Sequence, residues 1–352
     1  MGRTRQGSED GGMAQAYMTE SGQGHDPERN ASRARRLRDW WRPEGMWRRG
    51  IVLAVLAVLL GLLMILHAQV PNTVGNLGSL LETFLPWLGL IGVPVLLVAA
   101  VLRRSATAIV ALLLPAVVWA GLFGGQLTDK KGTGGNLTVV THNVSDKNLD
   151  PAGTARDIVK SGADVVALEE LTGDALPKYK EGLAKAYPYR TVQGTVGLWS
   201  KHPLTDAAPV DIKMGWTRAL RATVQAPSGK QVAFYVAHLP SVRVKLNAGF
   251  TANQRDNSAT ALGEAIAHER VKQVILLGDL NGTMNDRSLA PVTAQMRSAQ
   301  GAAGDGFGFS FPAAFPMARI DQIMMKGIDP VSSWSLSRTG SDHLPLAASV
   351  KI

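Results

Sequence analysis

Six apolar segments in the C-terminal two thirds of the chain each end in a carboxylate, an amide or an imidazole. In chain order these side chains are Asn143, Glu169 with Glu170, His238, Asp279 with Asn281, Asp321, and Asp342 with His343. Oxygen atoms of this kind are the ligands that a hard divalent cation prefers. Carboxylates and imidazoles can also act as base and proton donor in hydrolysis at phosphorus. The set therefore indicates metal-assisted phosphoryl chemistry, provided that the fold gathers these ends at one face.

The stretch VILLGDLNGTMND (274–286) contains two of these side chains. Its first four residues are apolar and β-prone, which predicts a short buried strand ending near Asp279 and Asn281. Side chains two residues apart in an extended segment point the same way. Asp, Asn and Gly are also the residues of ordinary turns. Taken alone, the stretch leaves a turn and a substrate-facing site open.

The elements that would position these side chains begin near residue 136. Strands are predicted at 136–143, 163–171, 196–200, 219–226, 231–237, 274–278, 318–325 and 344–352. Helices are predicted at 151–162, 174–186 and 251–270, and the Gly- and Pro-rich segment 297–317 predicts an irregular loop. Strands mixed with helices predict an α/β or α+β domain with a layered core over residues 136–352.

Seven motifs of this domain resemble, in the same order, those of the endonuclease/exonuclease/phosphatase superfamily, which includes exonuclease III, DNase I and bacterial sphingomyelinases. They are THN (141–143), DVVALEEL (164–171), GLWSKHPL (197–204), AHLPS (237–241), GDLNG (278–282), RIDQI (319–323) and SDHLP (341–345). GDLN and SDHLP are the specific pair. The resemblance implies a four-layer αββα sandwich (DNase I-like) with its site at one end of two central sheets. It favours the site over the turn for Asp279 and Asn281.

The resemblance also implies a metal and a base. Glu170 would bind Mg²⁺ or Mn²⁺, with Asn143 beside it and Asp342 near the metal. Asp279, helped by Asn281, would orient and deprotonate the attacking water.

Further roles follow from the same motifs. His343 would donate to a phosphate oxygen while Asp321 fixes its tautomer and raises its pKa, and His238 would contact the phosphate. Glu169 stands where relatives often have Gln, so its role stays open. Arg218 or Arg221 could bind substrate, although a solvated strand face explains both equally well.

Composition limits the alternatives. The absence of cysteine excludes disulfides, cysteine–zinc sites and thiol catalysis. The formal net charge is +9, of which residues 1–50 contribute +3 and residues 51–135 contribute +2. The remaining +4 on the C-terminal domain is too small to predict a nucleic-acid partner by itself.

The first third of the chain predicts a membrane anchor. Residues 1–50 are predicted to be a disordered, basic cytoplasmic tail, because 1–28 is polar and 29–49 contains eight Arg against two acidic residues. The tryptophans Trp40, Trp41 and Trp47 suit the headgroup region of an anionic leaflet. Apolar runs at 51–68, 84–102 and 106–125 predict three transmembrane helices over residues 51–125.

The arginines predict the orientation. Both the Arg-rich segment before the first run and the pair Arg103–Arg104 should be cytoplasmic, which is consistent for three spans. Residues 136–352 would then lie outside the cytoplasm, a placement that Lys130 and Lys131 oppose weakly. The expected location is the cell membrane, with several spans and an extracytoplasmic catalytic domain.

The whole arrangement resembles the VanJ-type membrane proteins of actinobacteria, which are linked to teicoplanin resistance. That resemblance implies action on a lipid-linked cell-wall precursor or its phosphate. The alternatives are an extracellular nuclease, a phospholipid phosphodiesterase of the sphingomyelinase kind, and a catalytically silent receptor. The retained acidic and histidine side chains argue against the receptor.

Overall fold

The computed structural model describes residues 45–245 and 249–352. The predicted disorder of residues 1–28 and most of the basic tail lie outside the described residues, so those predictions stay untested.

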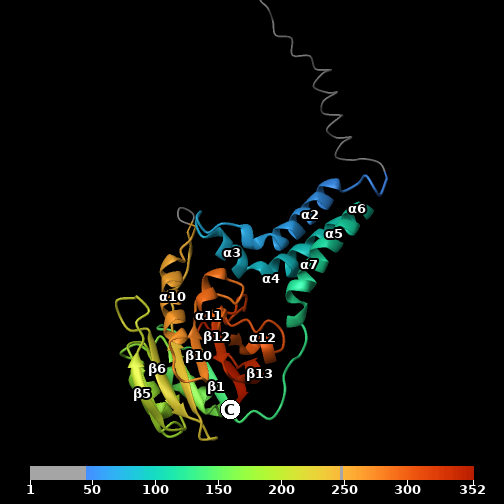
Figure 1. Cartoon of the computed structure of the whole chain (residues 1–352). Coiled ribbons are helices and arrows are strands. Elements are labelled where there is room, and N and C mark those ends of the chain that lie inside the picture. The colour runs from blue at the N-terminus through green and yellow to red at the C-terminus, as the bar shows by residue number, and fades with distance from the viewer. Residues whose placement is uncertain (1–44, 246–248) are drawn as a thin grey trace, which may run out of the picture.

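Two six-stranded sheets form the centre of the C-terminal domain (Figure 1). The first has the order β13-β14-β1-β2-β4-β3, with β1 at Leu137–Asn143, β2 at Val165–Glu169, β3 at Tyr189–Gln193, β4 at Val196–Ser200, β13 at Asp329–Ser335 and β14 at Leu346–Lys351. The second has the order β11-β12-β10-β7-β6-β5, with β5 at Leu204–Pro209, β6 at Ala219–Gln225, β7 at Gln231–Ala237, β10 at Val274–Asp279, β11 at Arg297–Ser298 and β12 at Asp321–Lys326. A small hairpin, β8 (Val244–Lys245) with β9 (Gly249–Phe250), stands apart from both sheets.

Helices cover the outer face of each sheet. Between the sheets lies a buried apolar core to which Val139, Phe234 and Leu277 belong. Helices α8 (Pro151–Lys160) and α9 (Leu176–Ala184) pack on the first sheet, and α10 (Asn253–Ala267) and α11 (Ala290–Thr293) pack on the second. The central strands are apolar on both faces because both faces are buried. The result is the predicted αββα sandwich.

The topology gathers strand ends at one edge. β1 is parallel to β2, and β7 is parallel to β10, so within each pair the carboxyl ends lie at the same edge of the sheet. Strand β12 runs antiparallel to β10, with Asp321 opposite Asp279. The last residue of β10 and the first residue of β12 therefore lie side by side at this edge.

The loop prediction for 297–317 is wrong in part. The segment begins with the short strand β11 and the helix α12 (Ala299–Ala303). Helix α12 begins at a Ser298 cap, whose side chain accepts a hydrogen bond from the Gly301 N–H at 3.3 Å.

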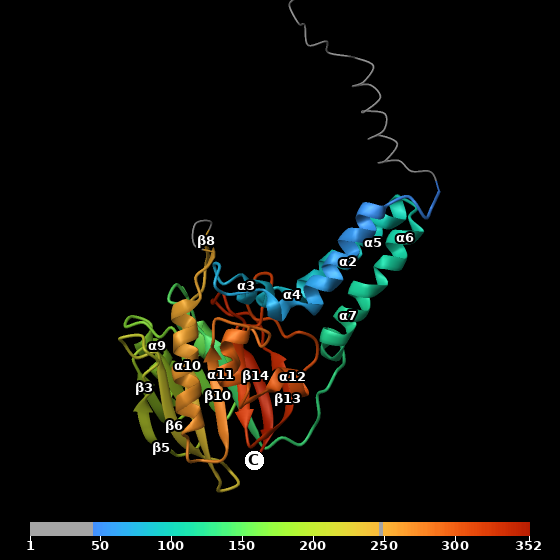
Figure 2. The same ribbon diagram turned by 45° about the horizontal axis from the view of Figure 1, so that its top comes forward.

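The N-terminal part forms a helical hairpin beside the sandwich (Figures 1 and 2). Its helices are α2 (Ile51–Ile65), α3 (Leu77–Thr83), α4 (Leu85–Trp87), a π-helical turn at Leu88–Gly92, α5 (Val93–Leu102), α6 (Ala106–Ala111) and α7 (Leu113–Phe123). Among the described residues, two continuous helices are long and apolar enough to cross a membrane, Leu85–Leu102 and Ala106–Gln126, with mean hydropathies of 2.4 and 2.2. Helix α2 has 15 residues and is shorter than a full span. The predicted count of three transmembrane helices therefore stays unconfirmed.

Two arginine pairs lie at the end of the hairpin that is remote from the sandwich. The Ala106 N–H donates to the Met46 carbonyl at 3.0 Å, and the Ser105 hydroxyl donates to the Arg49 carbonyl. Arg103 and Arg104 therefore lie at the same end as Arg48 and Arg49. This is the arrangement that the orientation prediction requires.

The other end of the hairpin docks on the sandwich. The Arg287 backbone N–H and Nε each donate to Glu82 Oε2 at 2.9 Å. Trp87 Nε1 donates to the Met317 carbonyl at 2.7 Å, and Asn76 donates to the Phe250 carbonyl at 2.6 Å. Polar contacts of this kind fix helices α3 and α4 against the domain that carries the predicted site.

Candidate active site

A cleft of about 530 Å³ opens at the gathered strand ends. The predicted site residues that line it are Glu170, His238, Asp279, Asn281, Asp342 and His343. Asn143 and Asp321 stand behind this lining and hydrogen-bond to Asp279 and His343. The fold therefore brings these eight predicted residues together, with Arg218 beside the cleft and Arg221 away from it.

Asp279 is held by three N–H donors. Its side chain accepts from the Asn281 backbone at 2.8 Å, from Asn281 Nδ2 at 3.2 Å and from Asn143 Nδ2 at 3.1 Å. Burial, and then the nearby Asp321 carboxylate, raise the pKa of Asp279 to about 7, although the His343 charge and the hydrogen bonds from the Asn281 backbone and Asn143 oppose the shift. A fixed carboxyl group with a pKa near neutrality is suited to general-base catalysis.

His343 is paired with Asp321. His343 Nδ1 lies 2.9 Å from Asp321 Oδ2, which also accepts from the Ser310 hydroxyl at 2.6 Å. Burial alone would lower the pKa of His343, but the Asp321 charge raises it to about 10. The imidazolium turns Nε2 toward the cleft, 3.9 Å from Asp279 Oδ2.

His238 and Glu170 also line the cleft. His238 Nε2 lies 3.5 Å from Glu170 Oε1 and 3.7 Å from Asp279 Oδ2. Burial, and then the nearby Arg218 charge, hold the pKa of His238 well below its usual range, so this imidazole is neutral. The cleft therefore contains one charged and one neutral imidazole.

Two residues of the cleft have left-handed backbones. Glu170 has φ +61 and Asn281 has φ +46, a conformation that costs energy for residues other than glycine. Asn281 is kept there by its own side chain, which donates to the Leu239 carbonyl at 2.9 Å. The neighbouring Gly278 has φ +144, and a Cβ at that position would collide with the Ala237 carbonyl of strand β7. The GDLNG motif thus contains glycine where two backbones approach closely.

The two arginines have different places. Arg218 is partly buried next to the site, where Glu170 and Asp279 act on it electrostatically, and its guanidinium lies 5.1 Å from the Trp216 ring centre. Arg221 is not in the cleft. Its Nε and Nη2 donate to the two carboxylate oxygens of Glu269, at 2.9 and 3.1 Å. The prediction that Arg221 binds substrate is therefore wrong, since a bidentate ion pair occupies its guanidinium on the outer face of β6.

Glu169 lies behind the lining of the cleft. It is fully buried, and Oε1 accepts from the Thr141 hydroxyl at 3.0 Å. Burial, and then the Asp321 charge, raise the pKa of Glu169 well above its usual range, which favours the neutral side chain. A protonated carboxyl group would bring no charge to the site.

Sequence analysis missed a buried ion pair that supports the site. Arg255 and Asp286 are both buried, and Arg255 Nη2 lies 2.6 Å from Asp286 Oδ2. Arg255 Nη1 also donates to the Asn281 carbonyl at 2.8 Å. Neither residue lies in a motif of the resemblance, and an Arg in a helix normally indicates a solvated face.

The residues present fit a divalent cation. Asp279, Asp321 and His343 place one ligand atom each within 4.8 Å of one another, so a carboxylate–imidazole cluster that could hold a metal ion exists. Asp321 and His343 are hydrogen-bonded to each other in that cluster, so the carboxylates of the cleft, and not the His343 imidazolium, would be the ligands. Glu170 and Asp342 add carboxylates to the same cleft. This set is rich in oxygen atoms, as a hard cation requires.

The αββα fold and this cleft together define a hydrolase of phosphate esters. The family model described as Endonuclease/Exonuclease/phosphatase family matches residues 140–343. The chain belongs to this family, and the match spans every predicted site residue from Asn143 to His343. No curated protein matches the chain in sequence.

Solved structures share the fold. TDP2 of D. rerio in complex with a single-strand DNA product has 18% identity and a TM-score of 0.52, over 61% of this chain and 99% of that chain. The endonuclease/exonuclease/phosphatase from Bacteroides vulgatus has 17% identity and a TM-score of 0.51, over 61% and 98%. The mannosyl-6-phosphatase Bt3783 of Bacteroides thetaiotaomicron has 16% identity and a TM-score of 0.50, over 61% and 100%. At these identities the likeness shows the fold alone.

Proposed function

We propose that the protein is a membrane-anchored, Mg²⁺- or Mn²⁺-dependent phosphohydrolase that acts on a lipid-linked phosphate outside the cytoplasmic membrane. One observation carries the proposal. Thr83 and Phe84, at the junction of α3 and α4 in the hairpin, line the same cleft as Glu170 and His343. A substrate in this cleft contacts the anchor and the catalytic residues at once.

The hairpin surface supports a bilayer setting. Large apolar side chains are exposed along it, among them Leu59, Val98 and Val117, which are 54%, 59% and 69% exposed. A contiguous apolar surface of this kind is unfavourable in water and favourable in lipid. The cleft lies at the end of the hairpin that faces the sandwich, so a lipid with a phosphate headgroup is the substrate class that reaches it most directly. A lipid-linked cell-wall precursor is the specific candidate.

Each side chain of the cleft has its own role in the proposed reaction. Asp279 accepts the proton of the attacking water while its three N–H donors hold the carboxylate in place. The His343 imidazolium stabilises negative charge on the phosphate oxygens, and the neutral His238 contacts the same group. Glu170 and Asp342 would hold the metal, with Asn143 next to them. When bound, the metal supplies positive charge that polarises the phosphate.

The proposed orientation places the catalytic domain outside. Arg48, Arg49, Arg103 and Arg104 share one end of the hairpin, and such clusters stay in the cytoplasm. A reporter fused to the C-terminus tests this placement. Activity of a periplasm-type reporter is expected, and activity of a cytoplasmic reporter alone would contradict it.

The full chain in lipid nanodiscs with Mg²⁺ tests the substrate. A polyprenyl pyrophosphate, phosphatidylinositol, sphingomyelin and plasmid DNA serve as alternatives, and turnover of the first is expected. His343→Ala should abolish the activity, while His268→Ala, on an exposed helix end, should keep it. Turnover of DNA alone, with a steep salt dependence, would replace the proposal by a nuclease.

A further inference from the structure

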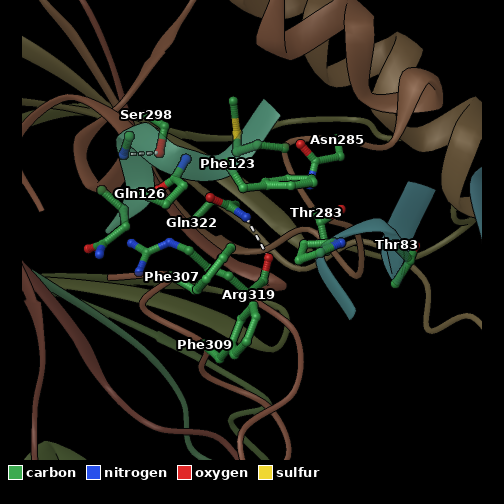
Figure 3. Close-up of a pocket in the computed structure, with 14 residues that line it drawn as sticks. Thr83, Phe123, Gln126, Thr283, Asn285, Ser298, Phe307, Phe309, Arg319 and Gln322 are labelled. Atoms are coloured by element: carbon green, nitrogen blue, oxygen red, sulfur yellow. Dashed lines mark hydrogen bonds between the residues drawn. The ribbon is translucent and has the colours of Figure 1, made fainter. Parts of the chain in front are cut away.

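A second cavity of about 90 Å³ lies between the hairpin and the sandwich, separate from the catalytic cleft. Pro86 and Phe123 from helices α4 and α7 line it together with Gln300, Arg319 and Gln322 from the sandwich. Figure 3 shows Phe123, Arg319 and Gln322 among the lining side chains. The two cavities share Thr83 in their linings.

Arg319 brings a buried positive charge to this cavity. It is 6% exposed, and Nη1 donates to the Gly308 carbonyl at 2.9 Å. Nε and Nη2 have no hydrogen-bond partner among the residues that the structure describes. Burial lowers the pKa of Arg319 to about 10, which leaves the group charged at neutral pH. Unpaired buried charges are costly, so these donors indicate a missing acceptor.

The amide groups of Gln322 and Gln300, which line the same cavity, each have an orientation that is fixed by hydrogen bonds. Gln322 Nε2 donates to the Arg319 carbonyl at 2.7 Å, and Gln300 Nε2 donates to the Asp305 and Gly306 carbonyls at 2.9 and 3.0 Å. These bonds identify the other amide atom of each side chain as oxygen. Neither Oε1 has a partner within the described part of the chain. A ligand must therefore accept from the guanidinium and donate to an amide oxygen.

A phosphate group meets both demands. Two of its oxygens can accept from a guanidinium edge, which fits such groups in bidentate fashion. Free phosphate keeps at least one hydroxyl to donate at neutral pH, and a phosphate monoester, with its second pKa near 6, keeps one in a minority of its molecules. A carboxylate has no hydroxyl to give.

Backbone geometry keeps the space for the guanidinium open. Gly308 has φ +59, and a Cβ there would collide with Arg319 Nη1 and with the amide of Gln300. Gly306 has φ +65, yet a Cβ there meets nothing within 4 Å. The wall next to them is aromatic, because Phe307 stacks on Phe309 at 5.1 Å and Phe309 stacks on Trp87 of α4 at 5.7 Å.

We propose that this cavity is a second phosphate-binding site, which holds either free phosphate or the phosphate of a lipid headgroup at the junction of Arg319 with helices α4 and α7. The site requires neither the reaction nor the substrate proposed above. By filling the space between anchor and sandwich, its ligand would stabilise their docking.

Equilibrium binding to the full chain tests the proposal. Radiolabelled inorganic phosphate is measured in detergent, and phosphatidic acid against phosphatidylcholine is measured in nanodiscs. The His343→Ala background weakens phosphate binding in the catalytic cleft, so the remaining binding reports the second site. Binding of phosphate, of phosphatidic acid or of both is expected, and the probe that binds identifies the source.

Matched variants assign that binding to the cavity. Arg319→Met and Gly308→Ala should each weaken it at least tenfold, while Gly306→Ala, with the same backbone conformation but open space, should leave it unchanged. If Arg319→Met does not fold, the two glycine variants decide. Absence of binding by both probes, as expected for a cavity filled by water only, overturns the proposal. So does binding that Gly308→Ala leaves intact.

Discussion

Replacing Arg255 with Met should destabilise the sandwich and slow catalysis by separate routes. Arg255 is fully buried and contacts three oxygen-bearing residues, at 2.6 Å for Asp286, 2.7 Å for Asp256 and 2.8 Å for the Asn281 carbonyl. The contact with Asp286 stabilises the fold, because it pairs two buried charges. The last concerns the site, because Asn281 in turn holds Asp279.

Substitution of Arg255 and substitution of Asp286 should lower the unfolding free energy by different amounts. Arg255→Met leaves the Asp286 carboxylate buried with a backbone donor, the Ser288 N–H at 3.0 Å, and the expected cost is about 3–5 kcal/mol. For a domain of this size the melting temperature should fall by roughly 6–20 °C. Asp286→Asn leaves Arg255 with Asp256 and the Asn281 carbonyl, so about 1–3 kcal/mol is expected.

A double variant separates stability from catalysis. Arg255→Met with Asp286→Leu removes both buried charges and should recover most of the unfolding free energy. Its kcat should stay about 10- to 100-fold low, because the Asn281 carbonyl still lacks its donor and small displacements in a site are costly. Thermal unfolding and hydrolysis of a soluble phosphodiester measure the two effects on the full chain. The reasoning fails if the double variant recovers both, or if Asp286→Asn costs more stability than Arg255→Met.

Three further outcomes are expected. Glu169→Gln should keep kcat within about twofold of wild type, because burial favours the neutral form of the native side chain, whereas a large loss would mean that Glu169 acts as an anion. Phe84→Ser should raise KM for a lipid substrate but not for a soluble ester, and Phe315→Ser, 65% exposed and not part of the cleft lining, serves as its control. Although burial opposes it, the Arg221 hydrogen bonds lower the pKa of Glu269 to about 2, so the pair stabilises the fold above the unfolded value of 4.5 and loses this effect as pH falls toward 2. The unfolding free energies of wild type and Glu269→Gln should therefore converge between pH 6 and pH 3, and a constant difference would show that the ion pair is not the cause.

Within the two six-stranded sheets, the strands that the apolar pattern did not predict are the edge strands β3, β5, β11 and β13. β3, β5 and β13 each end the order of a sheet, and most of their residues are partly or fully exposed. The strands predicted from apolar runs are mostly interior, with burial on both faces. An edge strand needs no continuous apolar pattern, because one side has no neighbour and its outer face meets water. Apolar patterning therefore indicates the middle of a sheet better than its borders.

Site residues could be predicted from the sequence where they stand at the end of a strand, because the sheet then fixes which edge they occupy. Asn143, Asp279 and Asp321 follow from strand ends, since parallel strands and an antiparallel neighbour meet at one edge. Arg218 and Arg221 could not be separated in this way. Arg218 lies just before β6 near the cleft, while Arg221 is within β6, paired with Tyr235 in register and turned to α10. Nothing in the sequence around Arg221 identifies its partner as Glu269, which follows the distant helix α10.

The apolar helices of the N-terminal part could be recognised from the sequence, but their part in the cleft could not. Arg287 connects the two parts. It donates to Glu82 twice at 2.9 Å and to the carbonyls of His67, Ala68 and Val70 at 2.7–2.9 Å. Such contacts depend on the docked geometry, and no pattern within either segment contains them.

Arg287→Met should therefore loosen the docking while leaving Asp279 and His343 in place. Glu82, which is 2% exposed, would lose the guanidinium but keep His67 Nδ1 at 3.1 Å and the backbone N–H of residue 287, so the expected cost to the docked state is about 1–3 kcal/mol. Protease sensitivity of the connection at 127–135 should rise. KM for the lipid substrate should rise as well, while kcat on a soluble ester should change by less than about twofold, because the chemistry needs only the strand ends. Equal losses on both substrates would show that the anchor shapes the reacting groups themselves, and the division of labour argued for this molecule would not hold.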